Sequence, residues 1–371
     1  MLRRCGFALL ASCGCTQVLG LDDQHYDRDP ALEAPGASSA GSGSALNGAA
    51  GAAPGGGGAP SVPGTGGAGG APPARSGKFP FALGPSRRIV ATTPEASSFY
   101  VYDAATGALE AYRPSLGTHP RNDRYEITGS WSWSPGFDLV VEVATGGGGA
   151  ALIGYRSDTG WVEYAPAPLP GEPLEPAPRS GTRNWTHLVP VRLEPTPALF
   201  SYDRKSGRYR LGPAEMGDPA DQQLGRWEVA WSNVVGVSGI AADPASAGLL
   251  KFEPETGEAE LDSVWLGEGA PAGLARGNFG LDWTSATAFA AKAGAGIVLY
   301  DANDGRVAIG ALALTDSSMN LSVKETGVWR GWIEQIVPIR VDGAPVAVTS
   351  GGGVVDLMQL DPLESSDITV E

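Results

Sequence analysis

The chain has 371 residues, of which 42% are hydrophobic and 18% are charged, and its formal net charge at pH 7 is −15. Proteins that bind the nucleic-acid backbone do so with clustered Lys and Arg, so this acidic balance excludes nucleic acid from the expected partners. The 54 glycines and 30 prolines favour short strands joined by turns over long helices.

Residues 1–15, MLRRCGFALLASCGC, are predicted to be a lipoprotein signal peptide with its lipidation site. Arg3 and Arg4 precede a short apolar run, which is typical of a secretory signal and is too short to span a bilayer. The tetrapeptide that ends at Cys13 resembles the bacterial lipobox, and Cys15 is the alternative acylation site. No Asp follows either cysteine, so the resemblance implies export across the inner membrane and an acyl anchor in the lipid bilayer of the outer membrane. An ordinary cleaved signal is the second interpretation.

Residues 16–77 are predicted to be a disordered low-complexity tether. From residue 30 to 77 the sequence is almost entirely Ala, Gly, Ser and Pro, which offers too little apolar side chain to offset the entropy of ordering. Residues 64–69 match the glycine pattern of dinucleotide sites, but no strand pattern precedes them and no helix pattern follows. No cofactor is therefore expected.

From residue 78 onward the sequence repeats a two-stranded unit, most clearly at residues 97–113. Each copy has an apolar run, a polar turn that closes on glycine and a second alternating run, which together predict a β-hairpin. The further copies are residues 152–164, 199–211, 249–261 and 297–309, with a weaker one at 346–358. The turn glycines are Gly107, Gly160, Gly207, Gly257, Gly305 and Gly353. Their spacing is close to the roughly 40–50 residue period of propeller repeats.

A second landmark, an aromatic residue followed by another apolar run, precedes each hairpin. The residues are Phe81, Trp133, Trp185, Trp231, Trp283 and Trp332. We expect them to pack between neighbouring sheets, since a buried aromatic of this size is a large apolar contribution. Four strands per unit and six units predict an all-β, six-bladed β-propeller with four antiparallel strands per blade over residues 78–371. Residues 366–370 are a candidate additional edge strand.

These repeats resemble those of WD40-type and related bacterial β-propellers. The resemblance rests on the segment 133–136 (WSPG) with Tyr155 and Thr159-Gly160, and it extends over residues 79–363. The Gly-His dipeptide of WD40 repeats is absent, and the hairpins are also similar to quinoprotein repeats. The resemblance therefore implies a propeller and leaves the blade type open.

One Asp recurs in the hairpin turns, at Asp103, Asp203 and Asp301. A ring of carboxylates on one rim is a possible cation site. Short polar side chains at turns usually accept backbone N–H groups, and we expect that role here. Of the three histidines, His25 lies in or beside the predicted tether and His119 lies in a Pro-flanked loop, so they are not expected to form a zinc site with His187, and no metal is expected.

The candidate ligand-binding residues are Trp131, Trp227, Trp329 and His187. The three tryptophans are extra copies that occur in the second, fourth and sixth units only, and aromatic side chains on a propeller face can stack on sugars or extended peptides. His187 lies near a predicted strand end, where a pocket can form. The alternative interpretation of all four residues is structural packing.

The sequence therefore predicts a non-catalytic scaffold of the cell envelope that binds a protein, peptide or glycan ligand. The alternative is a propeller enzyme, such as a hydrolase, a lyase or a quinoprotein-like enzyme, with its site at the central channel. Convergence of His187 with carboxylates such as Glu334 or Asp282 around that channel would favour this alternative. The fold alone does not decide between the two.

Overall fold

The computed structural model describes residues 76–77, 83–90, 97–116, 124–146, 148–193, 196–214, 222–228, 230–238, 240, 247–264, 271–291, 294–329, 333–351 and 354–360. These residues belong to one compact unit of the chain. Their regular structure is entirely β, which confirms the predicted class, and they include no helix that is long and apolar enough to cross a bilayer. The predicted signal peptide, the tether before residue 76, Phe81, Trp332, Gly353 and residues 366–370 lie outside the described residues.

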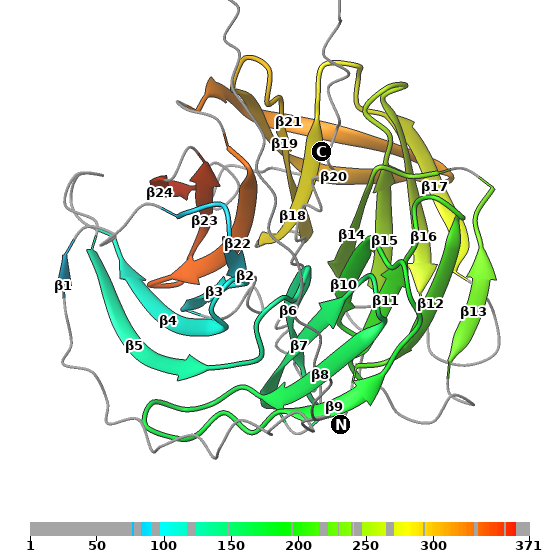
Figure 1. Ribbon diagram of the computed structural model, residues 1–371. Helices are drawn as coiled ribbons and strands as arrows, with labels where there is room; N and C mark the ends of the chain where they lie inside the picture. The colour runs from blue at the N-terminus through cyan, green and yellow to red at the C-terminus, as the bar shows by residue number, and fades with distance from the viewer. Residues whose placement is uncertain are drawn as a thin grey trace, which may run out of the picture. The chain divides into compact units, whose positions relative to one another are not determined.

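The strands form antiparallel meanders in chain order (Figure 1). The first sheet contains β1 (Ser76–Gly77), β2 (Arg87–Val90), β3 (Phe99–Asp103), β4 (Ala108–Ser115) and β5 (Arg124–Ser132). The second contains β6 (Leu139–Ala144), β7 (Ala150–Arg156), β8 (Trp161–Pro166) and β9 (Ala177–Ser180). The third contains β10 (His187–Val191), β11 (Ala198–Tyr202), β12 (Arg208–Pro213) and β13 (Gln223–Arg226).

A fourth sheet has eight strands, and the fifth has three within the described residues. The eight are β14 (Asn233–Ser238), β15 (Ala247–Phe252), β16 (Glu258–Val264), β17 (Ala272–Asn278), β18 (Ser285–Ala291), β19 (Gly294–Tyr300), β20 (Arg306–Thr315) and β21 (Ser318–Val328). The fifth sheet contains β22 (Gln335–Val341), β23 (Ala344–Gly351) and β24 (Val354–Gln359).

The burial of each strand follows its place in the sheet. In the middle of a sheet, β11 and β15 are buried along their whole length, because both faces are covered by neighbouring sheets. The outer strands β5 and β13 alternate between more and less exposed positions and carry more polar residues. The near-continuous apolar runs in the hairpins and the alternating runs elsewhere therefore both follow from how many faces of the strand are covered by neighbouring sheets.

Apolar side chains from neighbouring meanders fill the space between them. Within the described residues there are six such clusters, and the cluster around Ile89 and Val337 joins the first sheet to the last. The first strands β2, β6, β10, β14, β18 and β22 contact one another in this order, and β22 contacts β2. This is a propeller-like arrangement.

Of the repeated tryptophans, Trp133, Trp185 and Trp231 are each 4% exposed and belong to these clusters, which confirms their predicted place between sheets. Trp283 is only half-buried and packs at the edge of its cluster. Its indole Nε1 donates to the Phe279 carbonyl at 2.9 Å, which ties it to a surface segment.

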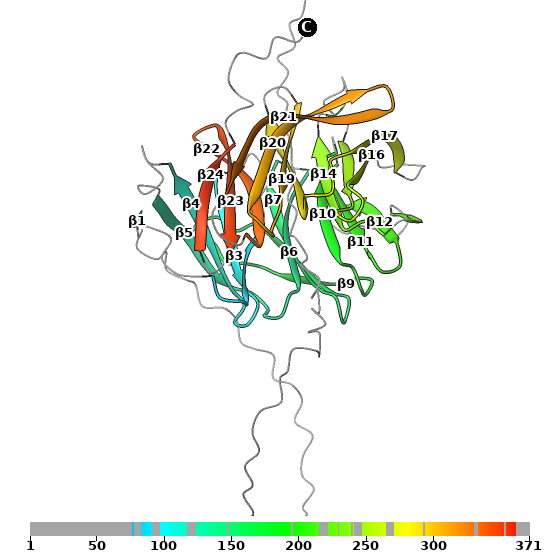
Figure 2. The ribbon, with the colours of Figure 1, turned by 90° about the horizontal axis from the view of Figure 1, so that it is seen from above.

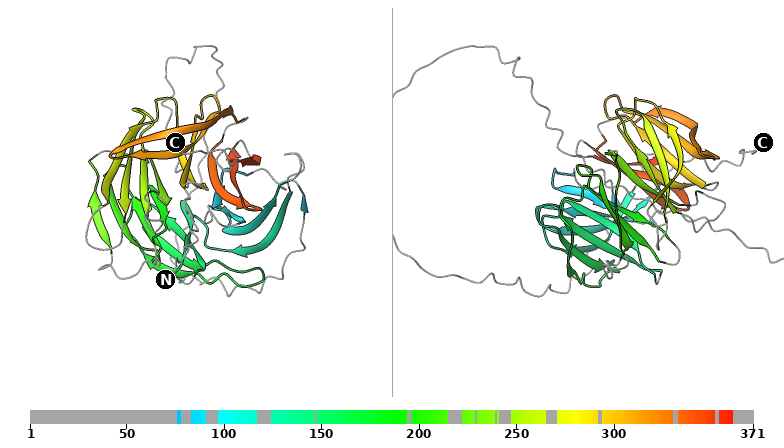
Figure 3. Two further views of the ribbon diagram at one scale, coloured as in Figure 1. Left: turned by 180° about the vertical axis from the view of Figure 1, so that it is seen from behind. Right: turned by 90° about the vertical axis from the view of Figure 1, so that its right-hand side faces the viewer.

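The hydrogen-bonded sheets differ from the predicted six separate sheets of four strands. β17 and β21 form a parallel bridge at one residue pair, Arg276 and Ser318, and this bridge joins two four-stranded meanders into the eight-stranded sheet. The edge strands of that sheet, β14 and β18, also contact each other, so the sheet is nearly closed into a barrel. In Figures 2 and 3 the β20–β21 hairpin extends across β17.

The bridge depends on a close backbone approach. A Cβ atom at Gly277 would lie 2.1 Å from the Met319 carbonyl oxygen, so only glycine fits there. β20 and β21 have 10 and 11 residues and a two-residue turn, whereas the corresponding strands of the other meanders are joined by longer segments. The sequence repeat does not reveal this extension.

The first sheet also differs from the prediction, because β1 adds a fifth strand to it. Ser76 and Gly77 pair with Glu126 and Tyr125 on the outer edge of β5. The sheet thus begins two residues before the predicted start of the domain at residue 78.

Candidate functional site on the turn face

Five hairpin turns are built in the same way. In each, the N–H of the turn glycine donates to the carbonyl four residues earlier at 2.7–2.9 Å, and the glycine φ is 70–77°. The glycines are Gly107, Gly160, Gly207, Gly257 and Gly305. Side chains with a Cβ rarely adopt this φ, which explains the regular recurrence of glycine in the sequence.

Each turn is also bonded to the segment that leads to the following meander. The glycine carbonyl accepts an N–H at 2.7–2.9 Å from Trp133, Gly181, Trp227, Phe279 or Trp329, in chain order. The five turns therefore lie on the same side of their meanders, and we call this side the turn face.

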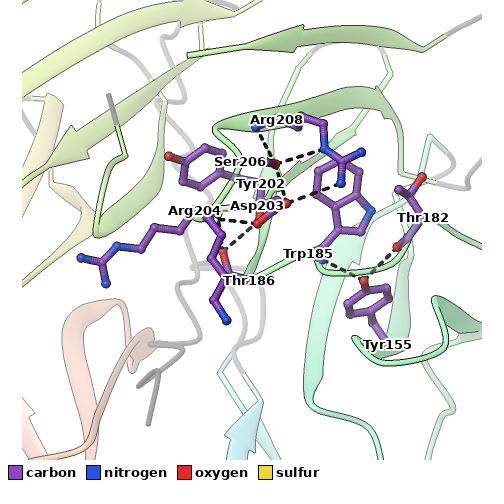
Figure 4. Close-up of polar contacts among 10 residues, drawn as sticks. Tyr155, Thr182, Trp185, Thr186, Tyr202, Asp203, Arg204, Ser206 and Arg208 are labelled. Carbon is purple, nitrogen blue, oxygen red and sulfur yellow. Dashed lines mark hydrogen bonds and ion pairs between the residues drawn. The ribbon is translucent and has the colours of Figure 1, made fainter. Parts of the chain in front are cut away.

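Tyrosine hydroxyls connect one meander to the next beside these turns. The Tyr155 hydroxyl accepts the Trp185 N–H at 2.9 Å and donates to the Thr182 carbonyl at 2.8 Å (Figure 4). Equivalent bonds run from the N–H groups of Phe137, Trp231 and Ile333 to the hydroxyls of Tyr102, Tyr202 and Tyr300. Burial raises the pKa of Tyr155 to about 12, so this hydroxyl stays protonated at neutral pH. We call these bonds the tyrosine clamp.

The repeated turn carboxylates accept backbone N–H groups of their own turns. Oδ1 of Asp103, Asp203 and Asp301 accepts the N–H two residues further on, at 2.9–3.0 Å. Burial acts to raise the pKa of Asp103, but hydrogen bonds from Ser86, the Ala105 N–H and Thr106, together with Arg87, outweigh it and hold the pKa below its ordinary value. The predicted turn role is confirmed. Across the described residues, no three His, Cys, Asp or Glu side chains form a group suited to a metal ion.

The candidate ligand-binding tryptophans lie in different apolar clusters. Trp131 is half-buried, and its Nε1 donates to the Glu172 carbonyl at 2.7 Å. Trp227 packs among Phe200, Tyr202 and Tyr209, with ring centroids 5.0–5.2 Å away. Trp329 stacks on Tyr300 at 6.3 Å. The structure does not gather the three indoles into one place, so binding by them stays a prediction for separate positions.

His187 is buried beside Tyr202, with its ring nitrogens close to polar groups of its own surroundings. Nδ1 lies 2.9 Å from the Thr186 hydroxyl, and Nε2 lies 3.1 Å from the Ser232 carbonyl. Of the carboxylates considered with it, Asp282 pairs with Arg306 at 3.6 Å, and Glu334 is exposed in the segment before β22. The described contacts thus give His187 and Asp282 separate partners.

A buried ion cluster lies between the third sheet and β15–β16. Lys251 Nζ, on β15, is 2.9 Å from Asp262 Oδ2 and 3.1 Å from Glu260 Oε1. The same ammonium lies 4.6 Å from the ring centroid of Trp227 and 5.1 Å from that of Trp231. Burial raises the pKa of Asp262 above its ordinary value, and Lys251 opposes this rise. The chain therefore supplies its own cation to the aromatic faces of Trp227 and Trp231.

The sequence analysis missed this cluster, although the sequence contains a signal for it. Lys251 interrupts the apolar run LLKF of a predicted central strand. A charged residue also stands three positions after four of the five turn glycines of the described hairpins, as Glu110, Glu163, Arg210 and Glu260. Glu163 accepts hydrogen bonds from the Ser134 hydroxyl and from the Trp161 indole. This position therefore places polar groups between sheets.

Charged side chains divide the turn face into two sectors. The basic sector consists of Arg183, Arg204, Lys205, Arg208 and Arg226, from the segment before β10 and from the hairpin and outer strand of the third sheet. The acidic sector consists of Glu255, Glu258, Asp282 and Asp304, from the next two turns and the segment between them. In Figure 4 the Arg204 guanidinium extends away from the network around Asp203.

Internal counterions moderate both sectors. Arg208 pairs with the buried Asp203 at 3.5 Å, and Asp158 and Glu228 are exposed near the basic sector. In the acidic sector Arg306 pairs with Asp282 and Asp301, and its N–H and side chain hold the pKa of Asp304 below its ordinary value. Each sector keeps an excess of its own sign.

Comparison with known proteins does not assign this chain to a family. No protein-family model matches the sequence, and the search of curated proteins gives no match. Among solved structures, the chain matches the one titled "Crystal structure of BBS1N in complex with ARL6DN, soaked with mercury". The TM-score is 0.43 at 10% identity, over 71% of this chain and 75% of that chain. The propeller-like arrangement itself rests on the strand pairing and contacts described above.

Replacing Tyr155 by Phe tests the tyrosine clamp. The change removes the acceptor of the buried Trp185 N–H, and an unsatisfied buried donor costs about 1–3 kcal/mol. We expect the free energy of unfolding to fall by about this amount in urea titrations. Tyr209→Phe, which removes a hydroxyl outside the clamp, is the matched control. Equal effects of the two changes would contradict the clamp.

Replacing Lys251 by Met tests the buried ion cluster. Removing one partner of a buried ion pair costs roughly 3–5 kcal/mol, because the remaining charge is buried without compensation. Without the ammonium the pKa of Asp262 rises further, so the loss is largest at neutral pH and shrinks as the pH falls and the carboxyl is protonated. Denaturant unfolding at neutral and acidic pH measures both effects. The exposed Lys205→Met is the control, with a change within about 0.5 kcal/mol. A loss that is independent of pH would contradict the role of Asp262.

Proposed function

We propose that this chain is a cell-envelope lipoprotein whose six-bladed β-propeller is a non-catalytic binding scaffold, with its ligand on the turn face. The single observation that carries the scaffold role is how the repeated polar groups are used. The turn carboxylates and the clamp tyrosines are hydrogen-bonded inside the fold, whereas the side chains exposed around them differ from turn to turn. Such a face offers a rigid frame with an adaptable surface.

The count of six blades is part of this proposal. It is supported by the order of contacts among the first strands, in which β14 and β18 occupy equivalent places next to each other. The eight-stranded sheet divides at one hydrogen-bonded pair of residues into two meanders with the same turn geometry. Each of its halves then corresponds to one blade.

The anchor is supported by the sequence of residues 1–15, with Cys13 as the acylated residue and Cys15 as the alternative. Acylation gives the chain a lipid bilayer as its first partner, and the absence of Asp after either cysteine favours the outer membrane. The ligand of the propeller is a protein, a peptide or a glycan.

Replacing Cys13 and Cys15 together by Ser tests the anchor. Without a thiol to acylate, the chain loses its hydrophobic anchor and is expected in the soluble fraction after cell lysis, whereas the unmodified chain sediments with membranes. Immunoblotting of the two fractions measures the change. Single Cys13→Ser and Cys15→Ser variants identify the acylated residue. Continued sedimentation of the double variant with membranes would contradict the anchor.

Glycan and peptide arrays probed with the full-length Cys13→Ser/Cys15→Ser chain test the scaffold role. Trp161 and Leu281 are 41% and 66% exposed beside turns of the turn face, so Ala at either position should weaken retention on the array at least about tenfold. Leu169, 64% exposed in the segment between β8 and β9 and far from the turn of its sheet, is the control for Ala replacement. Turnover of array compounds would support the enzyme alternative instead.

A further inference from the structure

The two sectors of the turn face adjoin each other. The turn at residues 203–207 and the first residue of β12 carry three residues of the basic sector, Arg204, Lys205 and Arg208, and the turn at residues 253–257 starts the acidic sector. Between them, the Tyr202 hydroxyl accepts the Trp231 N–H, and the Ser232 hydroxyl donates to Glu253. Opposite charges therefore lie side by side on a face held by direct hydrogen bonds.

Large apolar side chains are exposed beside both sectors. Trp161 follows the turn glycine Gly160 next to the basic sector, and Leu281 stands next to Asp282 in the acidic sector. Exposed aromatic and aliphatic side chains surrounded by charges are typical of protein contacts. The turn face thus combines apolar anchors with charges of both signs.

This distribution restricts the kind of partner. A uniformly anionic surface, such as an acidic lipid bilayer, is attracted by the basic sector and repelled by Glu255, Glu258 and their neighbours. A uniformly cationic partner is attracted by the acidic sector and repelled by the basic sector. Electrostatic complementarity requires a surface with both signs next to each other.

We propose that the turn face binds the turn face of a second copy of this chain. A twofold axis that lies in the contact plane, along the boundary between the sectors, places the basic sector of each copy against the acidic sector of the other. Such an isologous contact forms every charge pair twice and closes the assembly at two copies. The same operation brings Trp161 of one copy towards the sector that carries Leu281 in the other.

Salt dependence follows from the exposure of these groups. Exposed ion pairs are individually weak and are screened as ionic strength rises, so the dimer depends on several pairs acting together. The internal counterions Asp158, Asp203, Glu228 and Arg306 reduce the excess charge of the sectors without reversing its sign. The proposal extends the scaffold role by naming a partner, and it does not depend on the lipid anchor.

Sedimentation velocity of the full-length Cys13→Ser/Cys15→Ser chain tests this contact. We expect a dimer at about 20 mM NaCl and a monomer at about 500 mM, where the screening length is roughly a fifth as long. The reversals Lys205→Glu/Arg226→Glu and Glu255→Lys/Glu258→Lys should each give a monomer at low salt. An equimolar mixture of the two reversed chains should restore the dimer, because their sectors complement each other again.

The matched control reverses two charges away from the sectors. Arg124→Glu/Lys324→Glu changes exposed residues at the start of β5 and on β21, and this variant should dimerise like the parent chain. A parent chain that stays monomeric at low salt would overturn the proposal, as would reversed chains that still dimerise. Binding of the monomer to phosphatidylglycerol vesicles through Lys205 and Arg226 would overturn it in favour of a lipid surface. When the array experiment with the Trp161 and Leu281 single variants is run at about 500 mM NaCl, where the chain is expected to be monomeric, its result does not depend on this contact, so the scaffold role is tested separately.

Discussion

Burial between neighbouring meanders is the constraint on which the rest of this structure depends. Central strands such as β11 and β15 are buried on both faces, so no sheet can exclude water without a neighbour on each side. The hydrophobic contacts are not directional, whereas the hydrogen bonds of the tyrosine clamp are. Each hydroxyl bonds the backbone just before the next meander, and so sets where that meander begins. The turns are brought to one face as a result.

Much of this arrangement is encoded locally and could be predicted. A turn glycine such as Gly207 needs a positive φ and recurs with each hairpin, and Trp231 precedes the apolar run of β14 and is buried. The long β20–β21 hairpin could not be predicted, since its bridge from Ser318 to Arg276 joins residues of different repeats. The contact of Lys251 with the ring of Trp227, a residue of the preceding repeat, could not be predicted either. Contacts of this kind depend on the packing of one repeat against another.

The buried ion cluster and the charged sectors use the same residue types in opposite ways. Lys251 is held by two carboxylates and two indoles in a place where an unpaired charge is costly, so it favours one way of packing β15 against the third sheet. The charges of the turn face remain largely in water, where they cost little and are available to a partner. Function on this face can therefore change without a change of fold.

The seam between the first and last sheets has a mechanical consequence. The Ile89 N–H donates to the Gln335 side chain at 2.9 Å, a bond between residues 246 positions apart in the chain. The polypeptide itself runs from each of the other sheets to the next, whereas in the described part of the chain this seam is held by non-covalent contacts. Pulling the two ends of the described chain apart should therefore separate the first sheet from the last before any other pair of neighbouring sheets separates.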